Sequence, residues 1–207
     1  MTRRRIGASR AVIATAVACA VAGLAHAQGG EAERLKTQPT PAAAAQQQVD
    51  PARAAKANGD PDNATASVVD RSGKRVGLVT FTATPAGTVV TGEFTGLPAG
   101  VHGFHIHTVG KCEPPFDSAG PHFNPSSTQH GVAVGPGHAG DLPNLFVPEN
   151  GRVHVEFFAP EVTIRDGARS VFDADGSAVV VHADRDDHKT DPSGNSGDRI
   201  ACGVIER

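Results

Sequence analysis

Short runs of β-favouring residues, each closed by a turn, constrain residues 64–207 more than any other feature of the sequence. Turn residues separate several of these runs, as at Arg71–Gly73, Pro85–Gly87 and Asp173–Gly176. No window repeats its apolar residues at the 3.6-residue spacing of a helix. The pattern predicts an all-β fold, an antiparallel sandwich or barrel. Seven strands are expected: Ser67–Val69, Val76–Thr82, Val89–Phe94, Val101–His107, Val153–Phe157, Val179–His182 and Ile200–Ile205.

Composition narrows the class of protein further. The chain has nine Phe but no Trp and no Tyr, so its core must be largely aliphatic. A formal net charge of −3 argues against a broad basic surface, and no nucleic-acid partner is expected. Ten His in 207 residues are the most suggestive count, because His is the commonest metal ligand.

The first 27 residues have the organisation of a signal peptide. Four Arg and no acidic residue precede or flank an apolar run, Ala11–Ala25, which ends in the cleavage pattern Ala25–Ala27. The run is shorter than the roughly 20 residues that span a bilayer. We therefore expect residues 1–27 to be removed and the protein to be exported, periplasmic or secreted, with no stable membrane span.

Two further segments follow the predicted signal peptide. Residues 28–63 are rich in Ala, Gln and Pro and poor in large apolar side chains, which predicts a disordered linker. Residues 64–207 form the predicted β domain. It contains two cysteines, Cys112 and Cys202, and an even pair in an exported chain favours one disulfide. A pair of thiolate metal ligands is the alternative, although no C-x-x-C spacing supports it.

The histidines of the fourth expected strand alternate with apolar residues. Because side chains of a strand alternate between faces, His105 and His107 lie on one face and can converge on a single ion, whereas Phe104 and Ile106 point to the core. His102 is expected to be buried and hydrogen-bonded, orienting its neighbours rather than binding metal. His154 and His188 are expected at the surface.

A long segment without a strand pattern, residues 111–148, carries the remaining ligand candidates. Loops of this length in compact domains are usually functional. His122, His130, His138 and Asp141 make a closed set of three His and one Asp, which suits tetrahedral zinc and would order a Gly/Pro-rich loop. His182 closes a strand of small apolar residues and is expected to point into a specific site.

Four motifs, in this order along the chain, resemble those of the copper/zinc superoxide dismutases. The resemblance covers about residues 64–207 and implies a Greek-key β-sandwich or flattened barrel with long metal-binding and electrostatic loops. The motifs are Gly103–His107, Gly120–Pro125, His138–Leu142 and Gly194–Ile205.

The resemblance implies one copper and one zinc ion per subunit, and roles for particular residues. His122 would bridge the two metals. Asp186 would link a copper-binding His to a zinc-binding His, Arg199 would guide the anionic substrate, and Cys112 and Cys202 would form a disulfide. The implied copper ligands are His105, His107, His122 and His182, and the implied zinc ligands are His122, His130, His138 and Asp141.

The implied activity is the dismutation of superoxide to dioxygen and hydrogen peroxide. Copper would be alternately reduced and reoxidised, while His122 and Arg199 would act on the proton and on the substrate. The resemblance leaves a homodimer open. An alternative from another class is a non-catalytic, extracytoplasmic copper/zinc-binding protein or copper chaperone on the same fold.

Overall fold

The computed structural model describes residues 60–207, and the expected signal peptide and residues 28–59 of the expected linker lie outside the described residues. Apart from the 3₁₀ helix η2 (Asp117–Ala119), the named elements are strands. No helix within residues 60–207 has the length and apolar character needed to cross a membrane. The strands are β1 (Asn63–Asp70), β2 (Arg75–Thr84), β3 (Gly87–Thr95), β4 (Gly100–His107), β5 (Asp141–Val147), β6 (Arg152–Ala159), β7 (Ala178–His182) and β8 (Arg199–Glu206).

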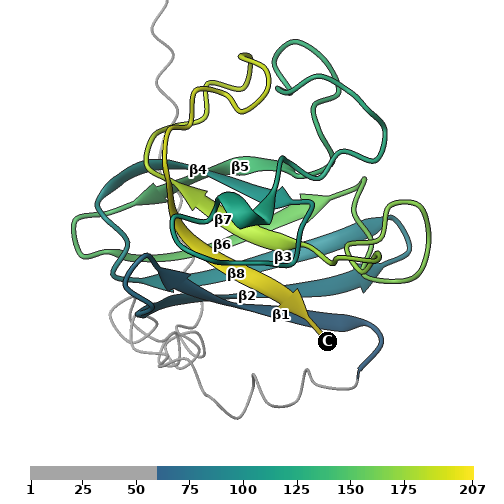
Figure 1. Ribbon diagram of the computed structural model, residues 1–207, viewed down its shortest axis with the longest axis horizontal. Helices are drawn as coiled ribbons and strands as arrows, with labels where there is room; N and C mark the ends of the chain where they lie inside the picture. Colours follow the sequence, from purple (N-terminus) through teal and green to yellow (C-terminus); the bar gives the residue numbers. More distant parts are fainter. Residues whose placement is uncertain (1–59) are drawn as a thin grey trace, which may run out of the picture. The chain divides into compact units, whose positions relative to one another are not determined.

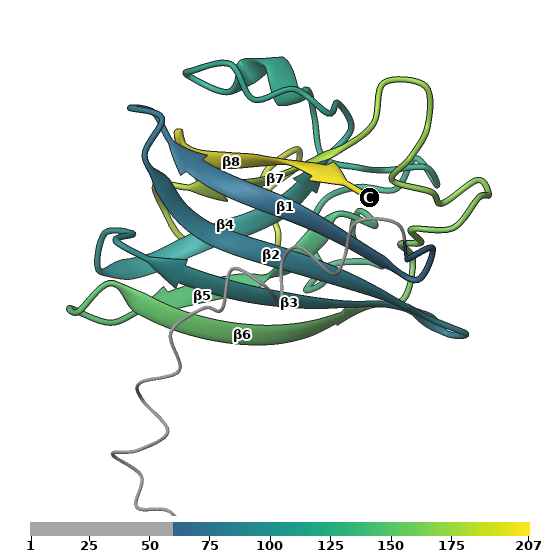
Figure 2. The same ribbon diagram turned by 90° about the horizontal axis from the view of Figure 1, so that it is seen from below.

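All eight strands belong to one antiparallel sheet that curls into a nearly closed barrel (Figures 1 and 2). Their order is β5-β4-β7-β8-β1-β2-β3-β6, and the two end strands, β5 and β6, also contact each other. Neighbours distant in the chain, such as β3 with β6 and β4 with β7, produce the crossing connections of a Greek key. The predicted all-β fold is confirmed.

The barrel interior is filled by the alternate residues of its strands. In β3, for example, Val90, Gly92 and Phe94 are buried, while Thr91 and Glu93 between them are partly exposed. The ring of Phe94 meets that of Phe104 on β4 edge to face, with centroids 5.7 Å apart. Aliphatic residues make up most of this core, as the composition requires.

Strand β4 departs from this alternation, since every residue from His102 to His107 is buried. Phe104 and Ile106 belong to the barrel core. His105 and His107 point to the opposite face, where the segments 108–140 and 183–198 cover the sheet (Figure 1). One strand therefore supports the apolar core on one side and a cluster of polar side chains on the other.

The seven expected strands are all present, with ends that differ by at most four residues. The expectation that residues 111–148 lack a strand is wrong, because Asp141–Val147 forms β5. Pro143 obscures this strand in the sequence, since proline cannot donate to a β ladder. Here Pro143 is exposed on a strand at the end of the sheet order, where that donor can be spared.

Candidate metal centre

Two clusters of potential metal ligands lie beneath the loops that cover β4. In each cluster, one ligand atom per residue lies within 4.8 Å of all the others. The first cluster is the set expected at copper, namely His105, His107, His122 and His182. The second is the set expected at zinc, namely His122, His130, His138 and Asp141. The structure thus gathers residues from β4, β5, β7 and the segment between β4 and β5.

In the first cluster, hydrogen bonds occupy one ring nitrogen of His107 and of His182 and leave the other facing inwards. The Nδ1 of His107 bonds the carbonyl oxygen of Gly120 at 2.8 Å, and the Nδ1 of His182 bonds that of Gly197 at 3.2 Å. Their Nε2 atoms face each other 3.4 Å apart. The buried Nδ1 of His105 has no hydrogen-bond partner within residues 60–207. Nitrogens arranged in this way fit a metal ion that prefers imidazole ligands, such as copper.

The second cluster surrounds the carboxylate of Asp141. Its oxygens lie 2.9 Å, 3.0 Å and 3.3 Å from the Nδ1 atoms of His122, His130 and His138, respectively. The Nδ1 atoms of His130 and His138 are buried without a properly aligned hydrogen bond. Three imidazole nitrogens around one carboxylate fit the four-coordinate site of zinc.

His122 belongs to both clusters through different nitrogens. Its Nδ1 faces Asp141. Its buried Nε2 has no hydrogen-bond partner in the described part of the chain and is the nitrogen left for the first cluster. The rings of His122 and His105 are 4.1 Å apart, centroid to centroid. A single imidazole can therefore contact an ion on each side.

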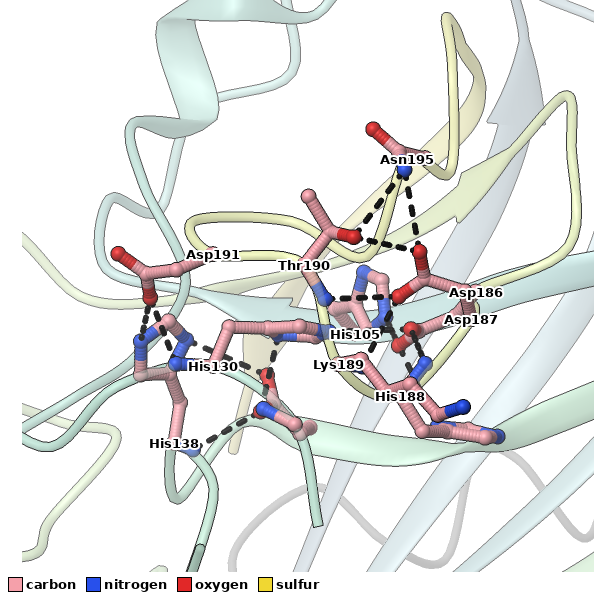
Figure 3. A network of polar contacts seen from close by, with 12 residues as sticks. His105, His130, His138, Asp186, Asp187, His188, Lys189, Thr190, Asp191 and Asn195 are labelled. Atoms are coloured by element: carbon pink, nitrogen blue, oxygen red, sulfur yellow. Dashed lines mark hydrogen bonds and ion pairs between the residues drawn. The ribbon is translucent and has the colours of Figure 1, made fainter. Parts of the chain in front are cut away.

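Asp186, expected to link the two metal sites, reaches one histidine of each cluster (Figure 3). Its carboxylate accepts hydrogen bonds from Nε2 of His105 at 2.8 Å and from Nε2 of His130 at 3.0 Å. The side chain is fully buried. Hydrogen bonds of this kind fix the tautomer and ring orientation of a ligand.

Two residues that support Asp186 were missed by the sequence analysis. The side-chain amide of Asn144 on β5 pairs with the main chain of Asp186 through two hydrogen bonds of 2.9 Å. The backbone N–H of His188 donates to the Asp186 carboxylate. His188 was expected at the surface, yet only 28% of its side chain is exposed. The signal for Asn144 was its polar side chain between buried Leu142 and Leu145.

His102 is buried and contacts only backbone oxygens through its ring. Its Nδ1 bonds the carbonyl oxygen of His182 at 2.9 Å, and its Nε2 bonds that of Pro98 at 3.0 Å. The ring thereby ties the end of β7 to the segment that leads into β4. It is not a member of either ligand cluster.

Arg199 stands opposite His182 in the β7–β8 ladder. Its guanidinium donates to the carbonyl oxygens of Phe116 at 2.8 Å and of Gly120 at 2.7 Å. The Gly120 oxygen also accepts the hydrogen bond from His107, so Arg199 is fixed beside the first cluster. The side chain is partly exposed, which leaves its charge available to an anion.

A disulfide joins Cys112 to Cys202 and ties the segment that carries Phe116 and Gly120 to β8. The two cysteines are 90 residues apart in the chain, and their Cα atoms are 5.6 Å apart. Around the bond, Phe116, Ala119 and Val180 form a small apolar cluster separate from the barrel core. The predicted disulfide is confirmed.

A family model described as "Copper/zinc superoxide dismutase" matches residues 75–205. The chain belongs to this family. The match covers most of the described residues, and it includes every histidine and aspartate of the two clusters.

Bacterial relatives resemble the chain over about two thirds of its length. Superoxide dismutase [Cu-Zn] 1 of Aquifex aeolicus is 42% identical over 145 residues, 68% of this chain and 86% of the relative. Superoxide dismutase [Cu-Zn] of Caulobacter vibrioides is 43% identical over 149 residues, covering 70% and 86% of the two chains. A crystal structure of a SOD-like protein from Bacillus subtilis superposes with a TM-score of 0.64 at 40% identity, covering 68% and 96%.

The pKa values of the histidines differ between the two clusters. Burial, together with the charges of neighbouring histidines, lowers the pKa of His105 to about 4, although Asp186 opposes the shift, and lowers that of His182 to about 3. Burial also lowers the pKa of His130, but the carboxylates of Asp141 and Asp186 outweigh it and raise the value to about 9. His105 and His182 are thus neutral at pH 7 and ready to bind metal, whereas His130 must release a proton.

We expect the metal-free protein to lose stability as the pH falls from about 6.5 to 4. His105 and His182 have pKa values near 6.5 when unfolded but about 4 and 3 when folded. The unfolded chain therefore binds more protons in this range, and the free energy of unfolding decreases by up to about 1.4 kcal/mol per pH unit for each group.

Thermal unfolding followed by circular dichroism between pH 7 and pH 4 tests this expectation. The melting temperature of the metal-free protein should fall steadily. That of the metal-loaded protein should start higher and fall more steeply, because bound metal keeps the ligand rings deprotonated in the folded state while the unfolded chain takes up protons. A flat profile for the metal-free protein would contradict it.

Proposed function

We propose that this protein is an exported superoxide dismutase that holds one copper and one zinc ion. It would convert two superoxide ions and two protons into dioxygen and hydrogen peroxide. The observation that carries the proposal is the shared imidazole of His122, which turns one ring nitrogen towards each of two buried ligand clusters. Membership of the copper/zinc superoxide dismutase family supports the same reaction.

The two ligand sets would divide the chemistry between them. Copper, when bound by His105, His107, His122 and His182, would supply reversible one-electron chemistry, and zinc would supply charge and fixed geometry without redox chemistry. The two hydrogen bonds that Asp186 accepts would hold His105 and His130 in the tautomers that direct Nδ1 to the metals.

The protein's own residues would handle the proton and the anion. His122 keeps Nδ1 towards Asp141, so Nε2 is the atom that would carry a proton to the reduced product. Arg199, charged at any working pH, is fixed by two backbone carbonyls and would orient superoxide at the cluster. The overall negative charge of the chain opposes attraction of an anion. Electrostatic steering of superoxide must therefore come from positive charges close to the cluster.

Export is part of the proposal. The basic, apolar and small-residue pattern of residues 1–27 supports a signal peptide. The Cys112–Cys202 disulfide supports an oxidising compartment, the periplasm or the exterior, because such bonds are rare in the cytosol. Fractionation of expressing cells, with N-terminal sequencing of the exported protein, tests this point. An intact N-terminus in the cytosolic fraction would contradict it.

Superoxide decay followed by stopped flow tests the catalytic proposal directly. Protein loaded with copper and zinc should accelerate decay, and the acceleration should require copper and be abolished by cyanide. Stoichiometric copper without acceleration would instead support the alternative, a metal-binding protein or copper chaperone without turnover. Failure to bind copper would refute the ligand assignment.

Replacing Arg199 with alanine is expected to lower kcat/KM for superoxide by roughly tenfold at low ionic strength, because a local cation no longer attracts the anion. R199K should retain part of the rate, since it keeps the charge but loses the two-carbonyl anchorage. Stopped flow at several salt concentrations measures both effects, and R152A on the exposed face of β6 is the control. An unchanged rate and salt dependence in R199A would exclude a guiding role.

A further inference from the structure

Asp191 joins two loops at the outer side of the second cluster. One carboxylate oxygen accepts a 2.6 Å hydrogen bond from the backbone N–H of His130, a residue 61 positions earlier in the chain. The same oxygen lies 3.8 Å from Nε2 of His138 (Figure 3). One side chain of segment 183–198 thus contacts two of the three histidines expected to bind zinc.

The ring of His138 has a free nitrogen on each side. Its buried Nδ1 points to Asp141 and has no hydrogen bond, so it is the nitrogen available to a metal. Nε2 would then carry the proton. A metal-bound imidazole normally donates this second N–H to a carboxylate, a carbonyl or water. The carboxylate that faces the Nε2 of His138 is that of Asp191, whose side chain is half exposed.

The corresponding N–H of His130 already has a carboxylate partner in Asp186, and so does that of His105. Asp191 would complete this pattern for His138. Asp191 and His138 also line a surface hollow of about 600 Å³. A carboxylate at this point stands between the second cluster and solvent.

We propose that Asp191 is a positioning residue of the zinc site, accepting the Nε2 proton of His138 and holding His130 through its backbone. The proposal rests on the zinc set proposed above. Asp191 keeps the two loops together on the side where the cluster opens to solvent, and it slows the release of zinc. A second backbone bond, from Ala133 N–H to the carbonyl of His188, joins the same loops at 3.1 Å.

Zinc release from the zinc-loaded protein into an excess of the chromogenic chelator 4-(2-pyridylazo)resorcinol tests this role. D191A is expected to release zinc about 10-fold faster and to bind it about 10-fold more weakly than the wild-type protein. D191N keeps an oxygen for the His130 N–H but loses the charge that favours the His138 proton, so its values should be intermediate.

Asp173 provides the matched control, because it lines the same hollow and makes no hydrogen bond or ion pair with the rest of residues 60–207. D173A and D173N should release zinc like the wild-type protein. Cobalt substituted for zinc gives a second readout. Its visible d–d bands should shift in D191A and remain unchanged in D173A, and circular dichroism should show both variants folded.

The outcomes distinguish a failure of the role proposed for Asp191 from a failure of the proposed zinc ligand set. If the wild-type protein binds zinc and D191A releases it at the wild-type rate with unshifted cobalt bands, the role of Asp191 is refuted while the zinc set stands. If the wild-type protein takes up no zinc or cobalt, the zinc set is wrong and the role of Asp191 fails with it.

Discussion

Replacing His107 with alanine is expected to reduce copper-dependent superoxide turnover by about 1000-fold or more, equivalent to roughly 4 kcal/mol of lost barrier reduction. The Nε2 of His107 faces that of His182 at 3.4 Å within the first cluster. Without it, three imidazoles remain, a set that binds copper more weakly and in a changed geometry. Stopped-flow decay of superoxide and the copper content of the purified variant measure the effect.

The barrel should remain folded in this variant. His107 points away from the core residues Phe104 and Ile106, and the Gly120 carbonyl that it bonds keeps its second partner, Arg199. H154A is the matched control, since His154 is 64% exposed on β6. Near-wild-type turnover in copper-loaded H107A would show that the first cluster is not the catalytic copper site.

Loss of the disulfide is expected to have the largest effect on stability. Replacing Cys112 and Cys202 with alanine releases a cross-link between residues 90 positions apart, worth about 4 kcal/mol by loop-closure entropy. For a domain of this size, that corresponds to a melting temperature lower by roughly 10 °C. Calorimetry of the metal-free variant and wild-type protein, each with and without reductant, measures the change.

The same variant is also expected to show slower turnover, because the freed segment carries both carbonyl oxygens that hold Arg199. Reductant should lower the melting temperature of the wild-type protein and leave that of the variant unchanged. Equal stability of the variant and the oxidised wild-type protein would mean that the apolar cluster around Phe116 holds the segment without the cross-link.

Local patterns in the sequence were sufficient to predict most strands of the barrel. Short runs of β-favouring residues, separated by turn residues, predicted seven strands. Strand β5 was not predicted, because Pro143 interrupts its sequence pattern. A strand at the end of the sheet order tolerates proline, but the sheet order is known only from the structure.

The ligand candidates could be identified from the sequence because histidine and aspartate side chains bind metal ions. The resemblance to a known family assigned them to two sets, and the structure brings each set together. Contacts between distant loops could not be predicted. Asn144 and Asp186 lie 42 residues apart, and Asp191 and His130 lie 61 apart, and no local pattern in either segment indicates its partner. His188 was placed at the surface because of its charged neighbours, yet the loop folds its side chain back over Asp186.

Burial of β4 on both faces has a consequence for its mutational tolerance. In an ordinary barrel strand, every second residue tolerates substitution, because its side chain is exposed to solvent. Between His102 and His107 no such site exists, since Phe104 and Ile106 fill the core and His105 and His107 lie under the loops. A saturation library of this stretch should therefore yield almost no neutral substitutions. Variants of altered activity are better sought in the covering loops than in the strand that supports them.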